Sequence, residues 1–203
     1  MAKPEQRDDA LRGVTGTDGT LKARVERAAL ELFAREGVDG VSIKEVAGAA
    51  GISDGAMYRY YKSKDALAAA LFETIHVRLY NLIEAALAGA SGFEDAVRRV
   101  VHVYCEAADD DPALFAYHLT HMQRFGTEMN PDRPDPVGLI AARLEAAMAA
   151  GDLPGGDAEV KAAAALGVVL QPTAHRMVGR FDKPMTAMAD RLADAALMVL
   201  RTV

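Results

Sequence analysis

The chain has 203 residues, of which 51% are hydrophobic and 26% are charged, enough to build one or two folded domains with a substantial core. Its formal net charge of -6 argues against a protein that coats nucleic acid through overall positive charge. The single cysteine, Cys105, excludes an intrachain disulfide and suits a reducing compartment. Since we find no apolar run near the length of a membrane span and no apolar secretory segment, we expect a cytoplasmic protein without a membrane partner.

The composition is that of a helical protein. Ala, Leu and Met are abundant, Trp is absent and runs of β-branched residues are few, so we predict an all-α fold of about nine helices. Residues 1–19 carry several glycines and many charges without a hydrophobic period, which predicts a disordered tail. Arg7 and Arg12 leave a DNA minor-groove arm as an alternative to a solvated segment there.

The first helix is predicted over residues 20–36. Apolar residues recur at helical spacing along it, and Gly37 marks its end. The residues of this apolar face are Val25, Ala28, Ala29, Leu32 and Phe33.

Two short helices are predicted next, over residues 43–50 and 54–60. Ser42 and Glu45 form an S-x-x-E capping box at the start of the first, and Gly51 suits the left-handed residue that ends it. Two helices joined by a short turn containing glycine form the helix-turn-helix pattern, whose second helix enters the major groove of DNA. The pattern therefore predicts an N-terminal DNA-binding domain.

The remainder of the chain predicts six more helices. A helix over residues 64–87 is about 35 Å long, long enough to join two domains as one rod. Pro172 lies inside a later helix and should kink it, either beside a pocket or only to fit the bundle. Breaks rich in Gly, Pro and Asp separate the later helices, which are predicted over 93–108, 112–126, 137–150, 157–180 and 185–201.

The domain organisation follows from these elements. We predict a disordered tail over 1–19, a three-helix DNA-binding domain over 20–66, and a helical ligand-binding and dimerisation domain over 67–203.

Residues 21–72 resemble the DNA-binding domain of TetR-type (tetracycline-repressor-like) transcriptional regulators. VERAALELFAREGVDGVSIKEVA is similar to that family's first helix and Gly-ended turn, and MYRYYKSKDALAAAL is similar to its Y-x-[YH]-[FY]-x-[SN]-K-x-x-L passage. Several spaced elements agree in order, which makes the resemblance more specific than any one short motif. Beyond this segment only the helical layout agrees.

The resemblance implies which residues contact DNA. Tyr58 and Tyr60 carry hydroxyls suited to phosphate oxygens, Arg59 reaches either a phosphate or a guanine edge, and the Ala56 methyl suits a thymine methyl. Asp54 departs from the family pattern: it either accepts a hydrogen bond from cytosine or complements the helix dipole. The expected DNA-binding residues are Ser42, Lys44, Ser53, Gly55, Ala56, Tyr58, Arg59, Tyr60 and Lys64.

The second predicted domain should hold a small-molecule site. Aromatic, Met and His residues cluster on its first helices, and a largely apolar cavity with a few polar groups is what such a site needs. The same residues at helical spacing also read as plain core. Besides Tyr104, the candidate ligand-binding residues are His102, Cys105, Phe115, Tyr117, His118, His121, Met122, Phe125, Gln171 and His175.

The last two predicted helices carry stripes of small and apolar residues suited to close helix packing across a two-fold axis. This matches the homodimer that the resemblance implies. The stripes are Val160, Ala164, Gly167, Val168, His175 and Val178 on one helix, and Met185, Met188, Leu192, Ala195, Ala196 and Val199 on the other.

We therefore predict a TetR-type repressor that binds a palindromic operator as a homodimer and is released by a mostly apolar small-molecule effector. A helical enzyme or an adaptor is the alternative. No Gly-rich phosphate loop, zinc-spaced cluster or nucleophile elbow occurs in the sequence, so we expect no catalysis and no cofactor. His118 and His121 lack an evident third ligand, so we expect no metal site.

Overall fold

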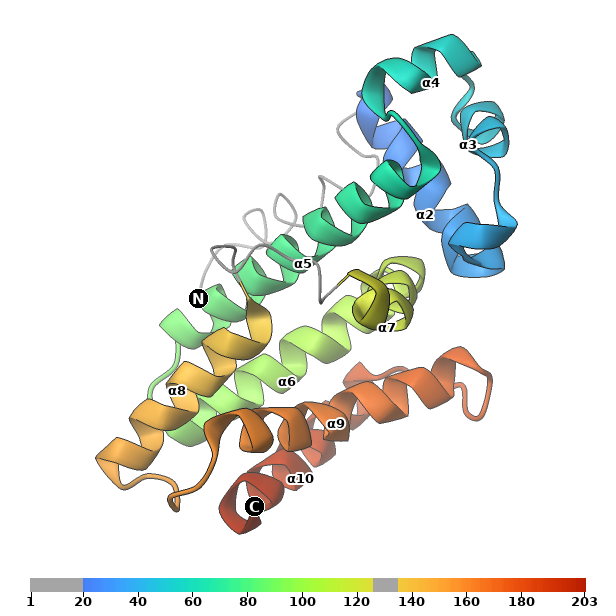
Figure 1. Cartoon of the computed structure of the whole chain (residues 1–203). Coiled ribbons are helices and arrows are strands. Elements are labelled where there is room, and N and C mark those ends of the chain that lie inside the picture. Colours follow the sequence, from blue (N-terminus) through green and yellow to red (C-terminus); the bar gives the residue numbers. More distant parts are fainter. Residues whose placement is uncertain (1–19, 126–134) are drawn as a thin grey trace. The chain divides into compact units, whose positions relative to one another are not determined.

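The computed structural model of the chain describes residues 20–125 and 135–203 (Figure 1). Within these ranges it has nine α-helices, one 3-10 turn and no strand, which confirms the predicted all-α class. The predicted tail over 1–19, with Arg7 and Arg12, lies outside the described residues, as does most of the predicted Pro-containing loop before residue 135.

The described residues pack into two compact units. The first comprises residues 20–78 and 116–125, and the second comprises 79–115 and 135–203. The first unit contains the whole predicted DNA-binding domain and adds residues 67–78 and 116–125 to it. Two helices, α5 (Lys64–Ala88) and α7 (Pro112–Phe125), contribute residues to both units.

The first unit is built from α2 (Leu21–Gly40), α3 (Ile43–Ala50), α4 (Asp54–Tyr60) and the adjoining parts of α5 and α7. Thr20 caps α2 by accepting a hydrogen bond from the Ala23 amide at 3.1 Å. Gly37 interrupts α2 with φ of 74°, a conformation open to glycine at little cost, which explains the helix end expected there. The Tyr117 hydroxyl of α7 donates to the Ala68 carbonyl of α5 at 2.8 Å.

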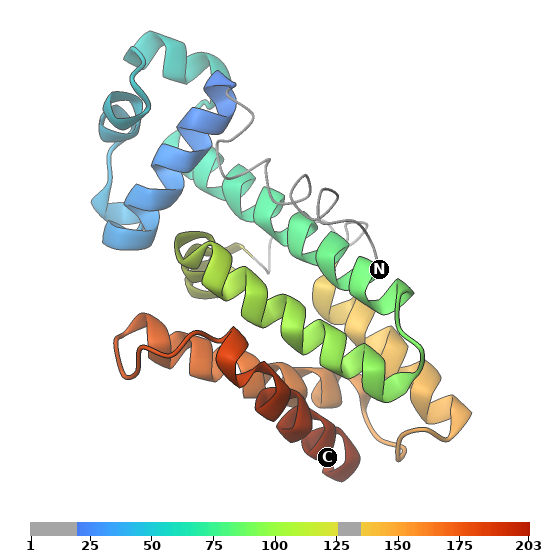
Figure 2. The ribbon, with the colours of Figure 1, turned by 180° about the vertical axis from the view of Figure 1, so that it is seen from behind.

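The second unit is a bundle of α6 (Phe93–Asp110), α8 (Pro136–Ala150), α9 (Ala158–Met177) and α10 (Ala189–Thr202), with a 3-10 turn, η2 (Thr186–Met188), before α10. Figure 2 shows α10 beside α6 and α9, and α8 packs on α9. The helix α9 runs through Pro172 without interruption. It ends near Gly179, which adopts φ of 72°.

The sequence led us to expect no apolar run near the length of a membrane span. The helix α5 corrects this expectation, because by length and composition it could cross a membrane, and it is the one such helix among the described residues. Half of its most apolar stretch is nevertheless buried inside the protein. Leu67, Leu71 and Ile75 are buried in the first unit, and Leu79 and Ile83 in the second, so its apolar side chains are accounted for by core packing.

Asp109, near the end of α6, joins three segments of the second unit. Its carboxylate accepts hydrogen bonds from the Met185 and Thr186 amides, both at 2.9 Å, and from the Thr186 hydroxyl at 2.7 Å. Arg176 of α9 donates to it at 2.7 Å. Burial alone would raise the pKa of Asp109, but these bonds outweigh burial and hold the pKa below its ordinary value.

We predict that Asp109→Asn lowers the free energy of unfolding by about 2 kcal/mol at neutral pH, because it weakens several partly buried hydrogen bonds at once. A lowered pKa contributes stability above the unfolded-state pKa of about 3.9, and that contribution is lost as pH falls through the folded-state pKa. Urea unfolding at pH 7 and at lower pH should therefore show the gap between wild type and variant closing in acid. Asp110→Asn, an exposed neighbour on the same helix, is the control; an equal effect at both positions would contradict the assignment.

Candidate nucleic-acid interface and ligand cavity

The start and end of α3 are set by local hydrogen bonds. Ser42 accepts from the Glu45 amide at 3.2 Å, while Glu45 accepts from the Ser42 amide at 2.7 Å, so the predicted capping box is confirmed. The bond from the Ser42 amide is the main reason that the pKa of Glu45 is lowered. At the other end, Gly51 is left-handed with φ of 68°, and Arg24 of α2 donates to the Ala50 carbonyl at 3.1 Å.

The helix α4 is held by two buried side chains. Met57 is fully buried, and Tyr61, directly after the helix, is buried with its hydroxyl donating to Glu26 of α2 at 2.7 Å. Glu26 is itself buried, and the ammonium of Lys22 lies 3.6 Å from its carboxylate. Burial, reinforced by the bond to Glu26, raises the pKa of Tyr61 well above its usual range. This anchor leaves the opposite face of α4 open.

The open face carries most of the predicted DNA contacts. Tyr58 is 54% exposed and Tyr60 is 44% exposed, large values for aromatic side chains. A Cβ added at Gly55 would meet no atom within 4 Å, so packing of the free chain does not require glycine there. Of the other predicted contacts, Ser42, Lys44, Ser53 and Arg59 are exposed, whereas Ala56 and Lys64 are half-buried.

A group of charges surrounds Lys64 at the start of α5. The Lys64 ammonium donates to the Asp39 carbonyl at 3.3 Å. Arg124 of α7 donates to the Asp39 carboxylate at 3.2 Å and to the Asp65 carboxylate at 2.9 Å. Arg124 thus neutralises two carboxylates beside Lys64. Sequence reasoning missed it because its partners lie 85 and 59 residues away along the chain.

The predicted ligand-binding residues do not gather in one place. Five of them belong to the first unit, where α7 packs on α5. His118 Nε2 lies 3.1 Å from His76 Nδ1, and Phe72 stacks on His118 with ring centroids 5.1 Å apart. Burial, followed by His76, lowers the pKa of His118 to about 3, so it is neutral at physiological pH. Four of the five belong to a cluster of neighbouring rings, and Met122 is half-buried; the four are Tyr117, His118, His121 and Phe125.

The other five lie in the second unit, and they too are dispersed. Cys105 is fully buried, which raises the pKa of its thiol to about 12. His102 lies 2.9 Å from Asp190, and Gln171 Nε2 lies 3.1 Å from His175 Nε2. Of the ten predicted ligand-binding residues, only Phe115 lines either of two cavities in the described residues, the smaller one, of 250 Å³.

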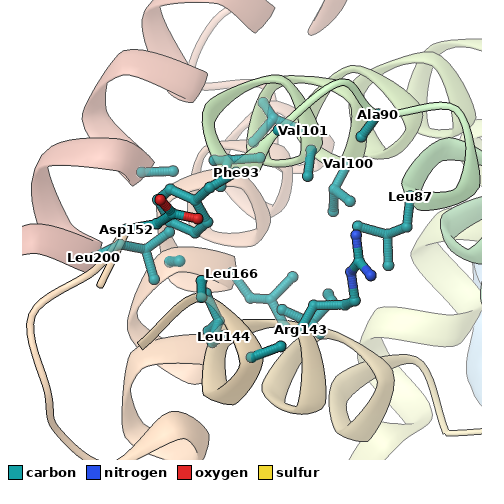
Figure 3. A pocket seen from close by; sticks show the side chains of 18 of the residues that line it. Leu87, Ala90, Phe93, Val100, Val101, Arg143, Leu144, Asp152, Leu166 and Leu200 are labelled. Carbon is teal, nitrogen blue, oxygen red and sulfur yellow. The ribbon is translucent and has the colours of Figure 1, made fainter. Parts of the chain in front are cut away.

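A larger cavity of 380 Å³ opens in the second unit (Figure 3). Its walls come from the end of α5 and from α6, α8, α9 and α10, and most of its side chains are Ala, Val and Leu. Tyr104, which sequence reasoning also singled out, lines it and is 5% exposed. Burial raises the pKa of Tyr104 well above its usual range, so it stays a neutral hydroxyl. The cavity is within the 300–1,000 Å³ range of small-molecule sites.

The described residues form no candidate metal site: no three His, Cys, Asp or Glu side chains among them are grouped so that they could hold a metal ion. A capped helix-turn-helix with an exposed, tyrosine-rich second helix is instead built to place side chains in the major groove of DNA. The geometry thus defines a helix-turn-helix DNA-binding protein with a separate apolar cavity.

Comparison with known proteins agrees with this class. Residues 27–71 match the family model described as bacterial regulatory proteins, tetR family. The chain is 31% identical over 98 residues to the nucleoid occlusion factor SlmA of Glaesserella parasuis and 31% identical over 94 residues to that of Haemophilus ducreyi. The matched segments are 48% and 46% of both chains, so the match spans about half the length of these curated relatives.

Solved structures share the fold over most of the chain. The fatty acid degradation regulator FadR from Bacillus halodurans superposes with a TM-score of 0.78 at 18% identity, covering 87% of this chain and 94% of its own. FadR from Bacillus subtilis, solved in complex with stearoyl-CoA, gives 0.77 at 14% identity, covering 89% and 98%. A tetR-family regulatory protein from Rhodococcus RHA1 gives 0.72 at 23% identity, covering 89% and 97%.

Residues 27–71 thus match the DNA-binding domain model of the tetR family, and the described chain shares its fold with solved tetR-family regulators.

Proposed function

We propose that the protein is a cytoplasmic homodimeric repressor that binds a pseudo-palindromic operator and leaves it when a mostly apolar small molecule binds the second unit. The observation that carries this proposal is the anchored α4. Met57 and Tyr61 fix one face of that helix in the core, so Tyr58, Arg59 and Tyr60 are presented to solvent.

The roles of single residues in DNA binding follow from their chemistry. The hydroxyls of Tyr58 and Tyr60 and the ammonium of Lys64 contact phosphate oxygens, which positions the protein without reading sequence. Ala56 and Arg59 contact base edges and carry sequence preference. Ser42, Lys44, Ser53 and Gly55 complete the interface, with Gly55 allowing the helix to approach the groove closely.

An uncovered apolar surface supports the homodimer. All six residues of the predicted α9 stripe are exposed or half-buried, with Val160 52% and Val178 72% exposed. On the α10 stripe, Met185 and Ala196 are buried, but Leu192 and Val199 are half-buried and Met198 beside them is 62% exposed. Exposed apolar patches of this kind mark association surfaces. A second copy presenting the same faces forms a closed, two-fold four-helix contact.

The 380 Å³ cavity supports an apolar effector. A solved structure of similar fold holds stearoyl-CoA, whose long acyl chain is apolar. An effector shifts an equilibrium only by its differential affinity, so the ligand must bind the DNA-incompetent conformer more tightly. The helix α5 runs unbroken from Lys64 to Leu87, which lines the cavity, and is the direct route for that change.

We predict that Lys64→Ala and Tyr58→Phe weaken binding to all DNA sequences about equally, because both remove phosphate contacts. Lys64→Ala should also lower the slope of log K against log salt by about one, whereas changes at Ala56 or Arg59 should alter base preference. Fluorescence anisotropy across a salt series measures both quantities. Arg98→Ala, which removes an exposed cation of the second unit, is the matched control. An unchanged slope in Lys64→Ala would contradict the phosphate contact.

We predict that the protein protects a discrete pseudo-palindrome whose half-sites lie about one helical turn, or a multiple, apart, because two recognition helices are related by a two-fold axis. Footprinting combined with sedimentation of the complex tests this. Met198→Glu should weaken the dimer and operator binding together, since it places a charge in the α9–α10 surface. Binding that is salt-sensitive but without sequence preference would refute the operator proposal.

We predict that Ala147→Phe reduces the response to an apolar effector at least tenfold while operator affinity is kept, since it fills the cavity that Ala147 lines. Ala142→Phe on the same helix, at an exposed position off the cavity, is the control. A panel of apolar small molecules is screened by thermal shift and by release of labelled operator. A variant that responds to the same molecules as wild type would place the effector elsewhere.

A further inference from the structure

The polar groups of the larger cavity are few and unevenly placed. Besides the Ser91 hydroxyl, which donates to Asp95 at 3.1 Å, the polar side chains that line it are Tyr104, Arg143 and Asp152. No hydrogen bond or ion pair joins the side chain of Tyr104, Arg143 or Asp152 to another group in residues 20–125 and 135–203. Tyr104 is buried on the cavity wall, whereas Arg143 and Asp152 are exposed, so the side chains of all three are available to a ligand.

The two charges stand apart in the cavity. Figure 3 shows the Arg143 guanidinium reaching from α8 toward Leu87, whereas the Asp152 carboxylate lies on the other side, near Phe93 and Leu200. Apolar side chains of α6 and α9 line the space between them. A ligand that spans this space meets a positive charge at one end and a negative charge at the other.

The volume of the cavity and its small side chains restrict the width of a ligand. Six of the lining residues are alanines, and at 380 Å³ the cavity is near the lower end of the usual range. Walls of Ala, Val and Leu favour a slender aliphatic body, and each methylene that is buried there adds to the affinity. The alanines are Ala90, Ala96, Ala146, Ala147, Ala165 and Ala196.

We infer that the effector is an anionic amphiphile, a carboxylate on an aliphatic body, bound with its head at Arg143. This inference rests on the proposed function of the cavity. The guanidinium presents a fork of donors that matches a carboxylate in two parallel hydrogen bonds, and its stem adds apolar wall. Asp152 repels the same head group, so it fixes the direction in which the ligand lies.

Tyr104 adds a second polar point. Tyr104 is 5% exposed and lies on the cavity wall. A ligand oxygen that reaches its hydroxyl accepts a hydrogen bond from it. An amphiphile bearing such an oxygen therefore binds more tightly than a purely aliphatic one.

The test uses the full chain and three probes of equal length: decanoate, decanol and decylamine, each below the concentration at which it aggregates. Calorimetric titration should show decanoate binding most tightly to the wild type. Arg143→Gln should weaken decanoate at least tenfold and leave decanol unchanged, and Arg143→Lys should restore part of the loss. Asp152→Asn should leave decanoate binding unchanged or tighten it, and Tyr104→Phe should weaken it a few-fold.

Arg98→Gln is the matched control, since Arg98 is an arginine of the same unit that pairs with Asp194 and does not line the cavity. Tighter binding of decylamine than of decanoate, equal binding of all three probes, binding of none, or an unaffected Arg143→Gln would each overturn the inference. The proposed function is judged separately: if Ala147→Phe still abolishes the response to other apolar molecules, the cavity remains the effector site and only the head-group assignment fails.

Discussion

The surface proposed to read DNA depends on how one short helix is anchored. Seven residues are too few for α4 to be stable as an isolated helix, so its shape and direction come from what it buries. Met57 enters the core of the first unit, and Tyr61 brings a hydroxyl to the buried carboxylate of Glu26. Because Glu26 belongs to α2, this bond also fixes the end of α4 against the first helix of the unit. The exposed tyrosines are a consequence of that anchor.

The second unit has two kinds of apolar surface: one lines a cavity, and the other is uncovered on the outside of α9 and α10. Small side chains on several helices leave a cavity, because Ala and Val do not fill the space that longer residues would occupy. The outer faces of α9 and α10 leave other apolar side chains uncovered. In the proposed function, the cavity holds the effector and the uncovered faces of α9 and α10 associate with a second copy.

The sequence predicted the local structure around α3 and α4 better than it predicted the lining of the cavity. The contacts of α3 and α4 depend on caps, a glycine turn and neighbours a few residues away, all of which are visible along the chain. The ligand-binding candidates were chosen by residue type on amphipathic helices. Hydrophobic periodicity indicates which face of a helix is buried. It does not indicate whether a side chain on that face packs against another side chain or lines a cavity. His118 meets a partner in His76, whereas Tyr104 lines the cavity.

The sequence by itself determined the all-helical class, most helix bounds to within a few residues and the helix-turn-helix, because caps, breakers and hydrophobic period act over a few residues. It also determined the family resemblance. Only the tertiary structure decided that Arg124 neutralises Asp39 and Asp65 and that Arg143 lies across a cavity from Asp152. Such groupings depend on how helices distant in sequence pack together, and packing is decided by the whole core at once.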